Sequence, residues 1–166
     1  MEEQIILWRW DKPTLRFIPE INWYVKELNR PLKSHNEIVY AGLTPYDWKK
    51  MKGDQDNVLH KIRITKDQAN QCVVAEGYFR PNTQELEKFI KKNGGDIVGS
   101  LTAYEEAHYE DSFVPLLEYN GGYNLPEVLI PFPVDAEIYS KQKRILSYAY
   151  LLYTRMFNML REFNKL

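Results

Sequence analysis

The chain has 166 residues, which suits one folded domain, and its content of 44% hydrophobic and 27% charged residues excludes wholesale disorder. The formal net charge of −1 excludes the strongly basic composition of many nucleic-acid-binding domains. The single cysteine, Cys72, excludes an internal disulfide and a zinc site built from several thiolates, which favours a reducing compartment.

The N-terminal stretch MEEQIILWRW begins with acidic residues and lacks the apolar run of a signal peptide. No uncharged run approaches the roughly 18 residues that a membrane-spanning helix needs. We therefore expect a cytoplasmic protein without a membrane partner, folded as one domain over residues 1–166.

In the first half of the chain, alternating apolar residues predict a strand over 3–10. A turn at Asp11, Lys12 and Pro13 joins it to residues 14–18 as a plausible hairpin. Helical spacing predicts a helix over 21–29 and a second over 44–51, in which Thr44 is the cap. Further strands are predicted over 37–43, 58–64 and 72–79, with the last two paired across TKDQANQ.

In the second half, TQELEKFIKKNGG predicts a helix over 83–92 that begins at a cap on Asn82 or Thr83. DIVGS is expected to be a strand, followed by a short helix from Thr102. FVPLLEY contains Pro115, so a strand there is expected at a sheet edge. YNGGYNLPEVLIPFP is expected to be a loop with an extended segment interrupted by prolines.

From Asp135 to about Asn164 the spacing predicts a long C-terminal helix that is apolar on more than one side. Such a helix is central to the core or shared with a second copy of the chain, so a homodimer through it is one expectation. Hairpins and helices without a strict strand–helix rhythm predict an α+β fold, a single domain with a mixed or antiparallel sheet and several helices.

The charges are unevenly distributed. Residues 93–140 contain no Lys or Arg, where the chain's average of 22 in 166 predicts about 6, and they contain nine acids. Residues 141–166 are basic. Either this basic segment neutralises the acids, or the acids form an exposed face that attracts a basic protein.

Within the acidic segment, AYEEAHYEDS gathers four carboxylates and a histidine among tyrosines, which are frequent contact residues in interfaces. The residues we expect to bind a partner are the acids and tyrosines of segment 100–124: Tyr104, Glu105, Glu106, Tyr109, Glu110, Asp111, Tyr119 and Tyr123.

An enzyme is the main alternative. In this alternative, Glu105 and His108 act as acid–base or metal-binding groups. They have the Glu-x-x-His spacing of di-metal helical bundles, but the motif occurs only once in the chain. Our leading prediction therefore contains no metal, cofactor or catalytic residue. His60 lies on an apolar strand face, where a hydrogen-bonded core histidine is the more frequent outcome. Nucleotide-binding glycine motifs and the serine-hydrolase elbow are absent.

A nucleic-acid-associated protein is the second alternative. The basic residues between Lys49 and Lys66 lie close to Trp48 and could form a patch with an aromatic platform. The acidic segment is larger than this cluster, so nucleic acid is not the expected partner. The leading hypothesis is a small protein-binding module of the inhibitor, immunity or adaptor kind that engages a basic protein.

Overall fold

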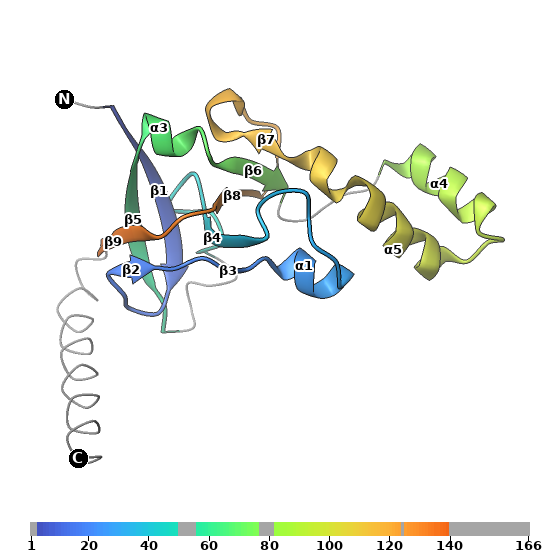
Figure 1. Cartoon of the computed structure of the whole chain (residues 1–166), viewed down its shortest axis with the longest axis horizontal. Coiled ribbons are helices and arrows are strands. Elements are labelled where there is room, and N and C mark those ends of the chain that lie inside the picture. The colour runs from blue at the N-terminus through green and yellow to red at the C-terminus, as the bar shows by residue number, and fades with distance from the viewer. Residues whose placement is uncertain (1–2, 50–55, 77–81, 124, 140–166) are drawn as a thin grey trace, which may run out of the picture.

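The computed structural model describes residues 3–49, 56–76, 82–123 and 125–139. Within these ranges it contains two antiparallel sheets and several helices, which confirms the predicted combination of α and β structure (Figure 1). The predicted C-terminal helix falls mainly outside the described residues. No helix of the described ranges is long and apolar enough to cross a bilayer.

The first sheet has four strands in the order β1-β5-β9-β2. Its strands are β1 (Gln4–Asp11), β5 (Val58–Thr65), β9 (Val134–Ile138) and β2 (Arg16–Phe17). β1 and β5 pair along their whole length, from Gln4 opposite Thr65 to Asp11 opposite Val58. The predicted hairpin of β1 with residues 14–18 is therefore wrong, because β2 pairs with β9 on the other side of β5.

The second sheet has five strands in the order β3-β4-β8-β6-β7. They are β3 (Glu20–Ile21), β4 (Glu37–Ala41), β8 (Pro126–Ile130), β6 (Val73–Glu76) and β7 (Val114–Pro115). The predicted pairing of β5 with β6 is wrong, since β6 lies between β8 and β7. Pro115 does lie in an edge strand, as its missing N–H predicts.

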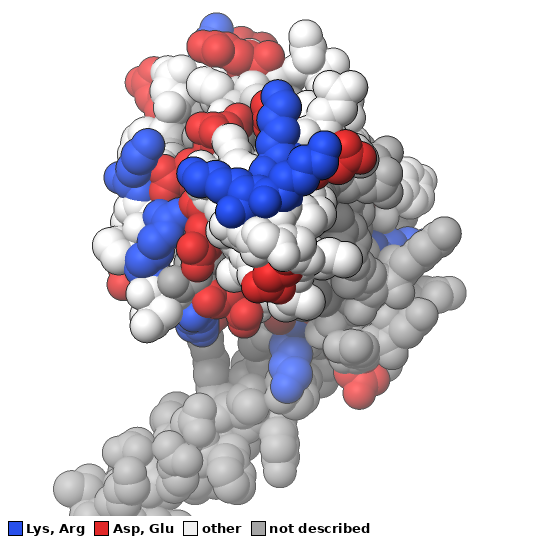
Figure 2. Space-filling view, turned by 90° about the vertical axis from the view of Figure 1, so that its right-hand side faces the viewer, with Lys and Arg blue, Asp and Glu red and all other residues white. Residues whose placement is uncertain are grey.

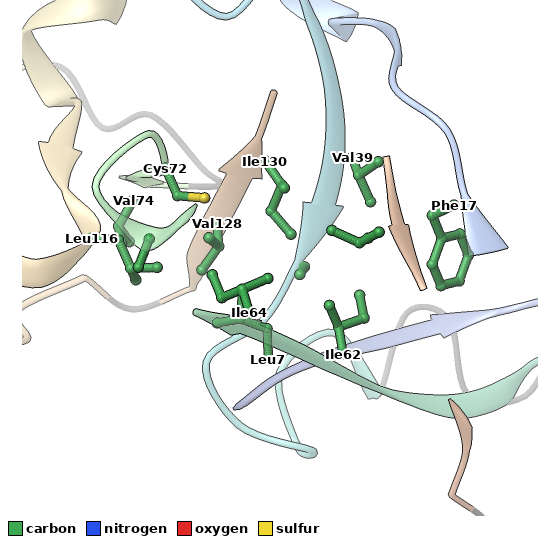
Figure 3. Packing of buried hydrophobic residues seen from close by; sticks show 13 residues of the cluster. Leu7, Phe17, Val39, Ile62, Ile64, Cys72, Val74, Leu116, Val128 and Ile130 are labelled. Carbon is green, nitrogen blue, oxygen red and sulfur yellow. The ribbon is translucent and has the colours of Figure 1, made fainter. Parts of the chain in front are cut away.

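The two sheets pack face to face over one apolar core (Figure 3). Leu7, Ile62 and Ile64 of the first sheet face Val39, Val128 and Ile130 of the second, and all six are at most 2% exposed. The predicted inward face of β5 is confirmed, because Val58, His60, Ile62 and Ile64 are all buried. Alternation of side chains along the strand brings these four residues to the same side.

Short helices connect the strands. They are α1 (Trp23–Leu28), α3 (Lys66–Ala69), η1 (Tyr109–Ser112) and η2 (Leu116–Glu118). α3 lies within the segment expected to link two paired strands, and it begins with a capping box between Thr65 and Gln68. α1 begins at Trp23 rather than at the predicted residue 21, because Asn22 caps it by accepting the N–H of Tyr24.

Two longer helices, α4 (Thr83–Lys92) and α5 (Ile97–His108), form a hairpin that extends away from the sheets (Figure 1). The predicted Asn82 cap is confirmed, since its Oδ1 accepts the N–H of Gln84 at 3.0 Å. α5 begins at Ile97, so a strand over 96–100 and a helix start at Thr102 are both wrong. The apolar run after Asp96 forms a helix and not a strand, because the Asp96 carboxylate caps the helix by accepting the N–H of Gly99 at 3.1 Å.

Candidate functional site

The segment predicted to bind a partner forms the end of α5, the short helix η1 and the loop after β7. Of its eight predicted contact residues, Tyr104 and Tyr109 are buried at 3% and 1% exposure. These two tyrosines are therefore not exposed anchors. The physical reason lies in the contacts within the chain, which are hydrogen bonds and ring packing for Tyr104 and ring packing for Tyr109.

Tyr104 joins the two helices of the hairpin. Its hydroxyl donates to the Oε2 of Glu85 at 2.8 Å and accepts the N–H of Asn82 at 3.2 Å. Its ring packs edge-on against Phe89, with 5.4 Å between centroids. Burial, together with the hydrogen bond to Glu85, raises the pKa of Tyr104. This side chain therefore holds α4 and α5 together.

Tyr109 fixes the base of α5 to the sheets. Its ring stacks on Tyr24 of α1 with 3.4 Å between centroids, and it contacts Phe113 edge-on at 4.9 Å. Burial raises the pKa of Tyr109 and raises that of Tyr24 to about 12. Beside this pair, the Tyr40 hydroxyl donates to the Oδ1 of Asn22 at 2.9 Å.

Tyr119 and Tyr123 are half-buried and hold the loop after β7. The Tyr123 hydroxyl donates to the carbonyl of Ser112 at 2.5 Å, and the Tyr119 hydroxyl accepts the N–H of Tyr123 at 3.0 Å. Their rings are tilted against each other at 5.2 Å. Both tyrosine side chains are therefore partly exposed, and the hydroxyl of each makes a hydrogen bond within the chain.

The four predicted acids lie closer to solvent. Glu106 and Asp111 are exposed, whereas Glu105 and Glu110 are half-buried. Asp111 lies 3.2 Å from the Nδ1 of His108, and Glu110 accepts the N–H of Lys33 at 2.7 Å. Within the described ranges, none of the four carboxylates forms an ion pair with a lysine or arginine.

Two other acids of residues 93–140, Asp135 and Glu137, form ion pairs with cations of the strands. Asp135 pairs with Arg16 at 3.2 Å. Glu137 pairs with Arg63 at 3.2 Å and with Lys61 at 3.9 Å. The expected neutralisation by residues 141–166 involves a segment that lies outside the described residues.

The end of the molecule that carries α4 and α5 is not uniformly acidic. Figure 2 looks onto this end and shows basic side chains gathered near its centre, with acidic ones around them. On α4 the exposed basic residues are Lys88, Lys91 and Lys92. The four predicted acids belong to the second half of α5 and to η1, on the sheet side of the hairpin (Figure 1).

The histidines expected in an enzyme do not converge. His108 packs against Tyr104 and contacts Asp111. His60 is fully buried between the sheets, where its Nε2 accepts the N–H of Thr14 at 3.2 Å. In the ranges that can be described, no three His, Cys, Asp or Glu residues are grouped so that they could hold a metal ion.

The basic cluster between Lys49 and Lys66 is partly neutralised on the first sheet. Lys61 lies 5.9 Å from the ring of Trp8 and 5.8 Å from that of Tyr139, and it shares Glu137 with Arg63. Lys49 and Lys66 are exposed elsewhere. The part of this cluster that is described is therefore not one continuous basic surface.

A groove of about 600 Å³, which the sequence did not indicate, lies where β1, β2, β3, β4 and α1 meet. Arg9 lines it: its guanidinium donates to Asp11 at 2.6 Å and to the carbonyl of Tyr40 at 2.9 Å, and it stacks over Phe17 at 4.5 Å. Lys12, Arg16, Lys26 and Glu20 add exposed charges, and Ile18, Ile21 and Trp23 add exposed apolar surface.

Sequence reasoning missed the groove because its residues come from separate elements. Exposed Ile and Trp residues carry the same pattern as buried ones, so only the packing distinguishes them.

The chain matches no protein-family model, no curated protein and no solved structure.

Proposed function

We propose that the protein is a binding module that engages a basic partner protein through the acids of α5 and η1. The observation that carries the proposal is that Glu105, Glu106, Glu110 and Asp111 lie on α5 and η1, and that none of their carboxylates forms an ion pair with a lysine or arginine in the described ranges. The two basic residues that contact them do so through the backbone: the Arg30 guanidinium donates to the carbonyl of Glu106, and the N–H of Lys33 donates to Glu110. Carboxylates that are not compensated attract a basic surface and accelerate its approach.

The buried tyrosines support this proposal in a different way from the one the sequence suggested. Tyr104 and Tyr109 hold the acidic half of α5 against α4 and α1, so the carboxylates are presented on a fixed backbone. Side chains on an ordered helix lose less conformational freedom on binding than side chains on a mobile loop.

Charge reversal at the two exposed acids tests the proposal. Glu106→Lys combined with Asp111→Lys should weaken the complex with a basic partner about tenfold, mainly by slowing association. The partner is first captured from the source cell with the wild-type chain, and the affinity of the purified pair is then measured by calorimetry at two salt concentrations.

A matched control reverses two exposed acids elsewhere, Glu37→Lys with Asp67→Lys, which changes the net charge equally. Glu110 is left unchanged because its carboxylate also accepts the N–H of Lys33. If the control weakens binding as much as the α5 variant does, the effect is one of total charge and the proposed face is wrong.

A further inference from the structure

The groove between the two sheets is a second surface with its own recognition chemistry, independent of the acids on α5. The chain crosses here from β2, the last strand of the first sheet, to β3, the first strand of the second, through Ile18 and Pro19. β2 and β3 each have one strand neighbour among the described strands, so their outer edges line a place where the sandwich is open.

The apolar part of the groove is unusual for its exposure. Ile18 is 68% exposed, Ile21 50% and Trp23 54%. All three line the groove, within six consecutive positions of the chain. Scattered single apolar residues are ordinary on a surface, whereas a group of them at a concave site is typical of a binding surface.

The charges of the groove favour an acidic ligand. Its lining contains the four cations Arg9, Lys12, Arg16 and Lys26 but only two carboxylates. Asp11 pairs with Arg9, and Asp135, which lies outside the lining, pairs with Arg16, so the lining charges outside these pairs are those of Lys12, Lys26 and Glu20. Lys12 and Lys26 are exposed and take part in no ion pair within the described ranges. An approaching carboxylate therefore meets an excess of positive charge.

The openness of the groove decides what kind of ligand it suits. Small molecules bind in pockets that cover most of the ligand's surface. This groove is too open to do so, because several of its lining residues have half or more of their own surface exposed. An extended peptide spreads its contacts along a trough and can use the outer edge of a neighbouring strand. We propose that the groove binds an extended peptide segment of another protein, in which acidic residues alternate with Leu, Phe or Ile.

The probe for this proposal is an array of immobilised decapeptides in which Glu or Asp alternates with Leu, Phe or Ile in varied order. A paired array carries Lys at every acidic position. The full-length chain should bind the acidic array and not the basic one, and the best peptide should bind in solution with an anisotropy change that weakens as salt is added.

Two variants assign that binding to the groove. Lys12→Glu with Lys26→Glu, and separately Trp23→Ala, should each weaken the best peptide about tenfold. The control is Lys33→Glu with Lys66→Glu, which changes the net charge as the first variant does but at exposed positions outside the groove. Circular dichroism confirms that each variant is folded.

Several results would overturn the proposal. These are equal binding of the two arrays, an acidic preference that survives Lys12→Glu with Lys26→Glu, or loss of binding in the control as well. Dimerisation in sedimentation that Trp23→Ala abolishes, without peptide binding, would assign the groove to a second copy of the chain. Binding of phosphatidylserine vesicles in place of peptides would assign it to a membrane surface.

The test also separates the two sites. The double variant with Glu106→Lys and Asp111→Lys changes residues outside the groove, so it should leave peptide binding unchanged. A failed acidic face with intact peptide binding, or the reverse, therefore contradicts only one of the two proposals.

Discussion

At the scale of single residues, His60 shows how one buried polar group fixes a loop. Its Nε2 accepts the N–H of Thr14, so the proton of the neutral ring lies on Nδ1 and points to the carbonyl of Arg9 at 3.3 Å. An imidazolium would turn a second N–H toward the N–H of Thr14. Burial, which disfavours the charged ring, is the main reason why the pKa of His60 is lowered, and the hydrogen bond to the carbonyl of Arg9 offsets only part of this shift.

This arrangement predicts a stability loss in mild acid. Because the folded pKa lies below the unfolded value of about 6.5, the contribution of His60 is complete above that pH and declines as the pH falls toward the folded pKa. Within this window the free energy of unfolding should fall by up to about 1.4 kcal/mol per pH unit. Urea unfolding between pH 7.5 and 5 measures the slope.

His60→Gln supplies the comparison, since an amide can accept from Thr14 and donate to Arg9 without titrating. The wild type should lose stability relative to this variant as the pH falls. Parallel curves would show that His60 does not stay neutral in the fold.

The tyrosines of the acidic segment explain why the site was only partly predicted. Tyrosine combines an apolar ring with one hydroxyl, so the same residue suits an exposed contact and a buried hydrogen bond. Neighbouring acids suggested exposure of Tyr104 and Tyr109. The partners that bury them, Glu85 and Tyr24, lie 19 and 85 positions away, and nothing in the segment itself reveals them.

At the scale of elements, α4 is a helix with no buried residue of its own. A helix of 10 residues is marginal in water by propensity alone. Its persistence depends on its caps and on contact with α5 through Phe89 and Tyr104. The hairpin should therefore open at a lower free energy than the sandwich does.

Removing the cap tests this difference. Asn82→Ala should destabilise α4 by about 1 kcal/mol, because the N–H of Gln84 loses its acceptor. Amide exchange over residues 83–92, followed by mass spectrometry, should then be about fivefold faster while β5 is unchanged. Asn120→Ala, in an exposed loop, serves as the control. A uniform increase across the chain would contradict a separate opening of the hairpin.

Elements whose own residues carry the pattern of a strand or the cap of a helix were predicted well. Elements whose structure depends on pairing with strands distant in the sequence were not. β5 alternates cleanly and α4 carries its own cap, so both were found. β8 was expected only as an extended segment of a loop, because Pro126 and Pro131 lie at its two ends. It is instead a strand in the centre of the second sheet, where β4 and β6 supply both neighbours. Residues 135–138 were expected to begin a helix and instead belong to β9, in which 136–138 pair with β5 and Asp135 pairs with Arg16 of β2.

At the scale of the whole molecule, stability depends on the interface between the two sheets. Ile62 is fully buried at that interface, whereas Ile18 is exposed in the groove. The two residues have the same side chain. Substitutions at these positions therefore separate what a buried isoleucine contributes to folding from what an exposed one contributes to the proposed binding.

Ile62→Ala should lower the free energy of unfolding by about 2–5 kcal/mol, because the cavity it leaves is surrounded by both sheets. Ile18→Ala should change it by less than about 0.5 kcal/mol. The urea midpoints of both variants give the comparison. A large loss for Ile18→Ala would mean that its side chain supports the fold.

The prediction of one domain over residues 1–166 stays a prediction, as does the homodimer through the C-terminal segment. The α+β class could be read from the sequence because it needs only the number and type of elements. The division into two sheets could not, since it depends on strand pairs between residues far apart in the chain, such as Val39 with Ile130 and Arg16 with Asp135.

The turn between α4 and α5 offers a place for attaching a reporter. Gly94 and Gly95 have φ of 66° and 91°, and an added Cβ at either position would meet no atom within 4 Å. The turn lies at the outer end of the hairpin, away from the sheets (Figure 1). A fluorophore or a short epitope inserted there would allow binding to be measured while leaving both of the proposed surfaces uncovered.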